Sequence, residues 1–264
     1  MNTNSDRHLA QLFVEASIGC ASASKLVDSV AEFEAYRIGH QDSEVILQAL
    51  REDGASLMKK GIQTTIQALA GFDLGHESWG LIKLYYSTYY FLRAALAYDG
   101  LAFLRCRNIY TLEMGLNSSP IKRSGKAFRG DHQATIKLYM DRLDGRDILL
   151  SQSIEDIKCY DWLRDKREWI NYRRREFIDP EGVKGLNSRT DSYAKQITTY
   201  CADSIPIYCF DPDYAALALP VKRAQISISS DPKWKSMLKD CLISFRGDGG
   251  TSASCDALEH CIIT

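Results

Sequence analysis

The segment WGLIKLYYSTYYFLRAALAYDG, residues 79–100, carries apolar side chains around nearly the whole circumference of a helix. A helix on a protein surface keeps a polar face toward water, so this segment predicts a helix buried at the centre of the fold. Arg93 lies inside the segment, and an unpaired charge in a protein interior is energetically costly. We therefore expect Arg93 to contact an acid, backbone carbonyl groups or a ligand.

Segments on both sides of this helix show the apolar spacing of amphipathic helices. They predict helices over residues 5–35 with a break near Gly19, over 42–70, over 132–143, from about Ser153 to Ile178, and over 188–204. Other short runs predict a hairpin of residues 101–105 and 109–114 and strands at 205–210 and 224–229. Asp211 and Asp231 each precede a proline, which is the pattern of a helix N-cap.

Together these elements predict a mainly α-helical fold, a helical bundle with small β elements in the middle and in the C-terminal part. Residues 1–180 would form the helical domain, and residues 181–264 would form a smaller mixed α/β extension. The Gly/Ser-rich stretch from Gly247 to Ser254 is typical of a flexible tail.

The composition limits the classes of protein to which the chain can belong. Its formal net charge is −1 over 264 residues, so affinity for nucleic acid would have to come from a local basic patch. The eight cysteines are scattered without a CxxC pair, which favours reduced thiols. The N-terminus lacks the apolar core of a signal peptide, and no stretch approaches about 18 apolar residues. We expect a cytoplasmic protein without a membrane span.

The familiar motifs of metal and nucleotide chemistry are missing from the sequence. The five histidines include no His-x3-His pair, so no metal site is predicted, and no cofactor is expected. There is no GxxxxGK[ST] loop, no GxGxxG after a strand and no GxSxG elbow, which disfavours nucleotide hydrolysis and α/β-hydrolase chemistry. The tyrosines near residues 85–91 are interpreted as core packing, with base stacking as the alternative.

The candidate site is the charged segment REWINYRRREF, residues 167–177. On a helical projection of about 100° per residue, Lys166 and Arg173 fall within the apolar face. Arg164, Arg167, Asn171 and Arg174 fall on an adjacent flank. Basic side chains on an apolar face suggest either buried acids or an anion pocket.

Two interpretations of this segment are open. It is a solvated helix with intrahelical ion pairs such as Arg164–Glu168, or it is a surface that binds phosphate or RNA. The residues of the second interpretation are Lys166, Arg167, Asn171, Arg173 and Arg174, joined by Lys122 and Arg123 of a basic loop at residues 117–131. Arginine suits phosphate because its planar guanidinium offers a fork of donors.

Two stretches of the chain resemble HEPN-type domains. YYSTYYFLRAALAYDG, residues 85–100, is similar to the buried helix of that family, in which an aromatic–Ser–x–aromatic segment precedes an arginine. Arg167 lies in a later helix, where the family carries its Arg-x4-6-His ribonuclease motif. The resemblance spans residues 79–178. It implies a helical domain of bacterial defence or toxin–antitoxin systems.

The chain departs from the family pattern at the histidine. In HEPN ribonucleases the arginine binds the scissile phosphate and the histidine assists attack by the ribose 2′-hydroxyl, whereas here Tyr172 occupies the position of the histidine. Tyrosine, with an ordinary pKa of about 10, is a poor base at neutral pH. Either the domain is non-catalytic, or Arg167 and Tyr172 act together with His132 from another helix.

Three functions follow from these alternatives. The first is a non-catalytic subunit that binds RNA or DNA or scaffolds a multi-subunit bacterial antiviral complex. The second is a metal-independent endoribonuclease using Arg167, Tyr172 and His132, with a homodimer completing its site. The third is an adaptor that uses its helices only to dock a partner ATPase or nuclease.

Overall fold

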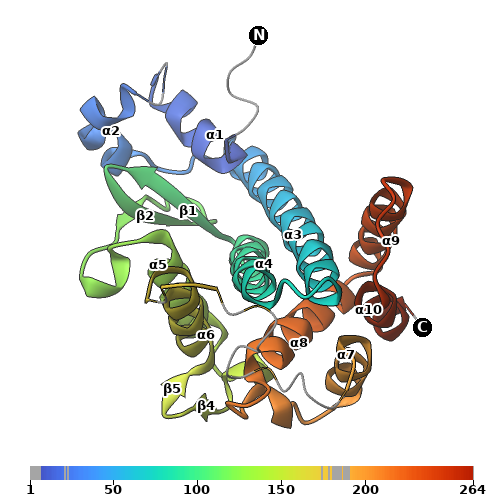
Figure 1. Ribbon diagram of the computed structural model, residues 1–264. Coiled ribbons are helices and arrows are strands. Elements are labelled where there is room, and N and C mark those ends of the chain that lie inside the picture. The colour runs from blue at the N-terminus through green and yellow to red at the C-terminus, as the bar shows by residue number, and fades with distance from the viewer. Residues whose placement is uncertain are drawn as a thin grey trace. The chain divides into compact units, whose positions relative to one another are not determined.

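The computed structural model describes residues 7–20, 22, 24–173, 175–177, 179, 186 and 191–263. Over these residues the chain is mainly α-helical, with one three-stranded and one two-stranded antiparallel sheet (Figure 1). The predicted fold class is therefore confirmed. No helix of the described part combines the length and the hydrophobicity that crossing a membrane requires.

The chain divides into two compact units. Unit 1 comprises residues 1–57 and 92–139, and unit 2 comprises residues 58–91 and 140–264. Helices α3 (Ser43–Asp73), α4 (Glu77–Tyr98) and α5 (Asp131–Leu143) contribute residues to both units. The domain boundary predicted at residue 180 falls on a position outside the described residues and stays a prediction.

The apolar segment at residues 79–100 forms helix α4, as its composition predicts. Its side chains Leu84, Tyr85 and Phe91 are almost completely buried. Arg93 is also buried, and its guanidinium lies over the ring of Phe103 at 4.1 Å from the centroid. The aromatic face is a partner that we did not predict for Arg93, and it attracts a cation through the ring quadrupole.

Unit 1 contains a three-stranded antiparallel sheet. Strands β1 (Leu101–Cys106) and β2 (Asn108–Glu113) form the predicted hairpin, in which Cys106 pairs with Asn108 and Leu101 with Glu113. Arg107 makes the turn with a φ of +57°. Strand β3 (Ile121–Lys122) pairs with β2 in the loop that was expected to be irregular.

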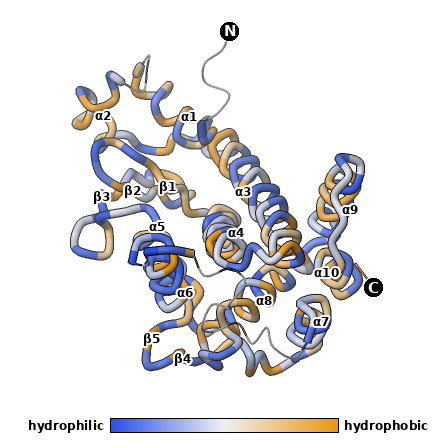
Figure 2. The backbone as a smooth tube through the Cα atoms, in the orientation of Figure 1, coloured by the Kyte–Doolittle hydropathy of each residue, from blue (hydrophilic) through white to orange (hydrophobic). Residues whose placement is uncertain are grey.

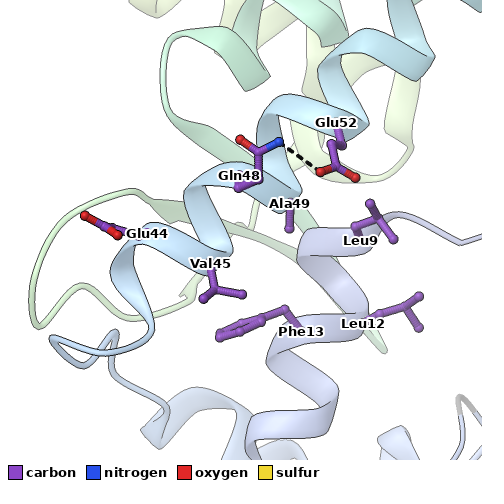
Figure 3. Close-up of a pocket in the computed structure, with 8 residues that line it drawn as sticks. All are labelled: Leu9, Leu12, Phe13, Glu44, Val45, Gln48, Ala49 and Glu52. Atoms are coloured by element: carbon purple, nitrogen blue, oxygen red, sulfur yellow. Dashed lines mark hydrogen bonds between the residues drawn. The ribbon is translucent and has the colours of Figure 1, made fainter.

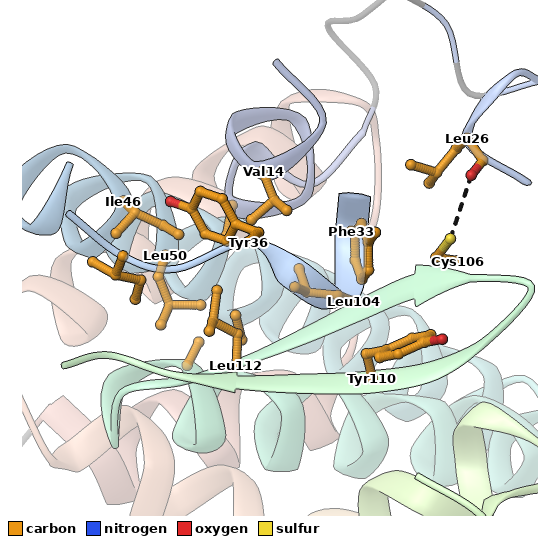
Figure 4. Close-up of a cluster of buried hydrophobic side chains, with 14 residues drawn as sticks. Val14, Leu26, Phe33, Tyr36, Ile46, Leu50, Leu104, Cys106, Tyr110 and Leu112 are labelled. Carbon is orange, nitrogen blue, oxygen red and sulfur yellow. Dashed lines mark hydrogen bonds between the residues drawn. The ribbon is translucent and has the colours of Figure 1, made fainter. Parts of the chain in front are cut away.

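The core of unit 1 lies between this sheet and the N-terminal helices (Figure 4). The helices are α1 (Leu9–Ser17), a 3-10 turn (Leu26–Asp28) and α2 (Val30–Ala35), with the predicted break near Gly19. Phe33 packs edge-on against Tyr110 at 5.2 Å between ring centroids. The Tyr110 hydroxyl donates to Glu34 at 2.6 Å, which satisfies the polar end of a buried ring.

Hydrophobic and hydrophilic residues alternate along the turns of α3 (Figure 2). The helix predicted over residues 42–70 begins at Ser43 and continues to Asp73. Its Gly61 lies against the ring of Phe91 in α4, and Ser87 and Thr65 both donate hydrogen bonds to the Gly61 carbonyl, at 3.0 and 2.9 Å. The absence of a side chain at Gly61 therefore lets the two helices approach closely in unit 2.

The long helix predicted to begin near Ser153 is wrong in its first turns. Residues 153–158 instead form a hairpin of β4 (Ser153–Ile154) and β5 (Ile157–Lys158). Its two turn residues, Glu155 and Asp156, have φ values of +50° and +63°. Positive φ at both central residues is typical of a two-residue hairpin turn and is incompatible with an α-helix. Helix α6 (Cys159–Glu168) begins only after the hairpin.

The two strands predicted in the last third of the chain are also wrong. Residues 207–209 form a 3-10 turn, and residues 224–229 are the last turns of helix α8 (Ala215–Ser229). The alternation in AQISIS resembles a strand, but the preceding apolar run AALALPV is already helical and buried, so the helix simply continues. Tertiary burial here outweighs a six-residue pattern.

The remaining helices of unit 2 are α7 (Tyr193–Ala202), α9 (Pro232–Gly247) and α10 (Ala253–Ile263). Asp231 caps α9 by accepting from the Lys233 amide at 2.9 Å, as predicted, whereas α8 begins four residues after Asp211. The Gly/Ser-rich stretch predicted as a flexible tail leads into α10. There the Asp73 carboxylate accepts from the Ser252 hydroxyl at 2.6 Å and from the Ser254 amide at 3.0 Å.

Lys222 of α8 is buried and supplies a C-cap to helix α7. Its ammonium group donates to the carbonyl oxygens of Asp203 at 2.7 Å, Cys201 at 3.1 Å and Tyr200 at 3.4 Å. These oxygens lie at the helix end where the dipole is negative, so a cation is stabilised there.

We expect Lys222→Met to lower the free energy of unfolding by about 2 kcal/mol, because the carbonyls lose a charged donor while the apolar stem is kept. Urea unfolding followed by tryptophan fluorescence measures this loss. Exposed Lys60 in α3 provides the control, since Lys60→Met should change stability by less than about 0.5 kcal/mol. Equal, negligible losses for both variants would show that the cap contributes nothing.

Candidate nucleic-acid interface

Arg167, the central residue of the candidate site, is buried among tyrosine rings of unit 2. Its Nη2 donates to the Tyr86 hydroxyl at 2.8 Å. The guanidinium carbon lies 5.2, 5.3 and 5.4 Å from the ring centroids of Tyr85, Tyr86 and Tyr172. Helix α4 supplies two of these rings, so residues far apart in sequence enclose one cation.

The charge of Arg167 is stable in this environment. Burial opposes the protonated guanidinium, but the hydrogen bond with Tyr86 and the other tyrosines raise the pKa of Arg167 above its ordinary value. Burial also raises the pKa of Tyr85, with the charge of Arg167 offsetting part of the rise. Arg167 Nε is buried without a hydrogen-bond partner. The guanidinium thus stays a cation, and its Nε donor is unused.

Helix α6 is followed by a π-helical segment, Trp169–Arg173. A π-helix turns through less than 100° per residue, so the regular projection fails beyond Glu168. Arg173 is therefore exposed to solvent and does not lie in the apolar face. This corrects the predicted position of Arg173, and it also explains how Tyr172 comes back over Arg167 although it is five residues further along the chain.

Lys166 likewise departs from its predicted position in the core face. Its side chain is partly exposed, and its ammonium group lies 4.5 Å from the Trp162 ring centroid and 3.9 Å from Glu155. The residue that α6 actually buries at this level is Arg167. Lys166 and Arg167 lie at opposite edges of the buried face of α6, so the projection alone does not show which of the two is buried.

Arg164 supports the interpretation in which intrahelical ion pairs satisfy the charges. Its guanidinium donates to Asp161 at 2.6 Å and to Asp165 at 3.0 Å, and it lies 3.8 Å from the carboxylate of Glu168. Burial opposes its charge, and the surrounding carboxylates raise the pKa of Arg164 above its ordinary value. This part of α6 is therefore held together internally and offers little to a ligand.

The segment after Arg167 presents a different, solvent-facing surface. The Tyr172 side chain is 70% exposed, and Phe177, 43% exposed, packs on Trp79, 49% exposed, at 5.4 Å between ring centroids. Arg173 and Arg175 are exposed as well, and Arg175 is 3.9 Å from Glu176. We call Tyr172, Arg173, Arg175, Phe177 and Trp79 the aromatic–basic surface.

The other predicted site residues are distributed over both units. Asn171 is half-buried in the π-helical segment, and Arg174 lies outside the described residues. Lys122 is exposed on β3, whereas Arg123 donates through Nε to Thr111 at 2.8 Å. His132, half-buried near the start of α5, belongs to unit 1 with Lys122 and Arg123, whereas Arg167 and Tyr172 belong to unit 2.

Sequence reasoning missed three residues of this region. Tyr86 was assigned to general core packing, but it is the hydrogen-bond partner of Arg167. Phe177 lies near the end of the predicted long helix and Trp79 begins the segment predicted to be buried, yet the two residues are 43% and 49% exposed. A helical pattern shows which residues are apolar but not where a helix ends or emerges from the core, so no signal in the sequence distinguished these rings.

Comparison of the chain with known protein families, with curated proteins and with solved structures finds no significant match. The resemblance to HEPN domains thus remains a sequence-based prediction. Within the described residues, no group of three or more His, Cys, Asp or Glu side chains is arranged to hold a metal ion. The function is therefore argued from the geometry of the aromatic–basic surface.

Proposed function

We propose that this chain is a non-catalytic, mainly helical subunit that binds single-stranded nucleic acid at the aromatic–basic surface. The observation that carries this proposal is the exposed ring of Tyr172, which rests on the buried cation of Arg167 and is followed directly by exposed Arg173. Single-strand binding combines exposed rings, on which bases stack, with cations that follow the phosphates. The Trp79–Phe177 pair supplies two further partly exposed rings.

The position of Arg167 supports binding over catalysis. A ribonuclease arginine has to reach the scissile phosphate, but the Arg167 side chain is only 8% exposed, and one of its donors is bonded to Tyr86. Its charge acts on a ligand mainly through the Tyr172 ring that it supports. Exposed Arg173 is better placed to meet phosphate directly, and arginine has the donor geometry for that contact.

The exposed ring predicts a specific loss of binding. We expect Tyr172→Ala to weaken binding of a labelled single-stranded RNA by about 1 to 3 kcal/mol, the contribution of one stacked base, measured by fluorescence anisotropy in EDTA. Tyr172→Phe should bind as well as the wild-type protein, because it keeps the ring. RNA that is cleaved by the wild-type protein and spared by Tyr172→Phe would instead support the endoribonuclease.

The salt dependence of RNA binding tests whether Arg173, the residue after Tyr172, contacts phosphate. Arg173→Ala should reduce the slope of log K against log salt by about 0.7, the value for one phosphate contact on a single strand. Lys60→Ala, which removes the same charge from an exposed position of α3, should leave the slope unchanged. Equal effects of both substitutions would show that Arg173 contributes only through the overall charge of the protein and not through a phosphate contact. Failure of the wild-type protein to bind RNA at low salt would contradict the proposal.

The proposal also concerns the complex in which the subunit works, and this part rests on the sequence resemblance to HEPN domains. We propose that the subunit works in a multi-subunit bacterial antiviral complex. Its test is the identity of the proteins that copurify with the tagged chain from its native host. Recovery of the chain alone, under conditions that preserve weak complexes, would contradict this part without affecting the RNA-binding measurement.

A further inference from the structure

A second surface, remote in sequence from the aromatic–basic surface, lies within unit 1. Helices α1 and α3 border an open groove of about 630 Å³ (Figure 3). Its lining is Leu9, Leu12, Phe13, Glu44, Val45, Gln48, Ala49 and Glu52. Leu9 and Val45 are 37% and 55% exposed. An apolar groove that stays open to solvent in a folded unit is typical of a site for another protein.

The walls of this groove are held in place by buried polar groups behind it. The Asp53 carboxylate of α3 accepts from the amides of Leu9 at 2.7 Å and Ala10 at 3.0 Å, so it caps the start of α1. Buried Gln11 accepts from the Arg105 amide at 2.7 Å and donates to the Arg105 carbonyl at 3.1 Å, which fixes α1 to strand β1. These bonds therefore fix the position of α1 relative to both α3 and β1.

Two acidic residues contribute to the lining of the groove. Among the residues that the structure describes, Glu44 and Glu52 are the ionisable ones in this lining, and Glu52 accepts a hydrogen bond from Gln48 at 2.9 Å. Both glutamates are exposed, at the two ends of the α3 wall. From Glu44 to Glu52 this wall spans nine residues, a rise of about 12 Å at 1.5 Å per residue, which matches roughly two turns of a bound helix.

We propose that the groove binds an amphipathic helix of a partner protein, with apolar residues at i, i+3 or i+4 and i+7 and with lysine or arginine beside them. The apolar residues would pack between Leu12, Phe13 and Val45, and the basic residues would meet Glu44 and Glu52. Helices dock into apolar grooves in this way, and complementary charge selects the partner and its direction. A second copy of the chain fits less well, because an isologous contact would place the two acidic rims together.

The test uses designed peptides as probes, with the full chain as receptor. Probe K is a labelled amphipathic helix of about 14 residues, or roughly four turns, with leucines at the stated spacing and lysines beside them. Probe E is identical except that glutamates replace the lysines. Fluorescence anisotropy should show probe K binding about tenfold more tightly than probe E at low salt, with the difference shrinking as salt screens the rim.

Two receptor variants assign the binding to this groove. Glu44→Lys combined with Glu52→Lys should reverse the preference, so that probe E binds more tightly than probe K. Val45→Arg should weaken both probes about tenfold or more, since it places a charge among apolar contacts. Val45, Glu44 and Glu52 are exposed, so the folding of both variants, checked by circular dichroism, should be unchanged.

Three results would overturn the proposal. Failure of probe K to bind at any concentration at which it stays soluble would exclude a helix site of this kind. Equal binding of the two probes would remove the assigned role of the glutamates. A wild-type dimer in sedimentation velocity that Val45→Arg converts to monomer would identify a second copy as the occupant. None of these results bears on RNA binding by Tyr172, which is measured separately.

Discussion

Asp147→Ala should lower the free energy of unfolding of unit 2 by about 3 to 5 kcal/mol, because it leaves a buried arginine without its counter-charge. Arg223 Nη1 lies 2.8 Å from Asp147 Oδ2, and the two side chains are only 8% and 5% exposed. Tyr160 donates to the same carboxylate oxygen at 3.0 Å, and the Leu149 amide donates to Oδ1 at 3.1 Å. One carboxylate therefore holds the 3-10 turn Ile148–Leu150, α6 and α8 together.

Tryptophan fluorescence is the appropriate measurement for this prediction. All four tryptophans, at positions 79, 162, 169 and 234, belong to unit 2, so their fluorescence reports the unfolding of that unit in urea. The expected result is a lower urea midpoint for Asp147→Ala. Tyr160→Phe, which removes the hydrogen bond to Asp147 and the long one of 3.4 Å from Arg223 but no charge, should lose only about 1 kcal/mol.

The double variant Asp147→Leu with Arg223→Met separates the ion pair from its surroundings. Replacing a buried pair by apolar side chains of similar volume is often neutral, because the cost of removing both charges from water disappears with them. We therefore expect the double variant to recover most of the stability that Asp147→Ala loses. A double variant as unstable as the single one would show that the loss comes from packing or from the Leu149 cap and not from a stranded charge.

Gly61→Val should have the second largest effect, a loss of about 3 kcal/mol. A Cβ atom at Gly61 would lie 2.7 Å from the nearest carbon of the Phe91 ring, which real Cβ atoms do not tolerate. Phe91 is almost completely buried, so its ring has no solvent-filled space into which to move. Overpacking of a close helix contact usually costs about 1 to 3 kcal/mol, and a branched side chain belongs at the upper end of that range.

Gly71 in the same helix provides the matched control. The nearest atoms to a Cβ at Gly71 are 4.0 Å away, an ordinary van der Waals distance. Gly71→Ala should therefore increase stability by about 0.5 to 1 kcal/mol, because alanine loses less backbone freedom in a helix than glycine does. Gly61→Ala should lower the stability of unit 2, although it brings the same gain in backbone entropy. If both alanine variants stabilise unit 2, α3 and α4 adjust easily and the close contact at Gly61 is not a constraint.

A second change tests whether the Phe91 ring causes the loss at Gly61. Phe91→Leu removes part of the ring that the new Cβ would meet, so the pair Gly61→Ala with Phe91→Leu should lose less than the sum of the two single losses. Residues in direct contact are expected to show such non-additivity. Strict additivity would place the strain elsewhere in the α3–α4 contact, for example at the hydrogen bonds that Thr65 and Ser87 make to the Gly61 carbonyl.

The sequence was most informative about long, regular elements. The apolar run at residues 79–100 is long enough that only a buried helix accommodates it, and α4 is such a helix. The hairpin of β1 and β2 and the N-cap at Asp231 were predicted correctly as well, because each depends on neighbouring residues alone. Short patterns were less reliable: AQISIS alternates like a strand, but it ends a helix whose preceding residues are buried.

For the candidate site, the sequence by itself determined that an arginine-rich segment lies in the C-terminal part of a predicted helix and that Arg167 is its central residue. Only the tertiary structure decided which basic side chain enters the core. The hairpin at Glu155–Asp156 delays the start of α6, and the π-helical segment changes the rotation per residue beyond Glu168. Both features depart from regular α-helical geometry, which a helical projection assumes throughout.

The sequence likewise determined the chemical types available at the site, aromatic rings and arginines, but not their partners. Tyr86 and Arg167 are 81 positions apart, and their hydrogen bond exists because α4 and α6 meet in unit 2. For the same reason, the sequence pattern could not predict which aromatic rings are exposed to solvent. Three rings, those of Trp79, Tyr172 and Phe177, are exposed to solvent. They lie where α4 begins and where α6 ends, and no other described element covers them there. Only the packing of the whole unit determines which residues are covered.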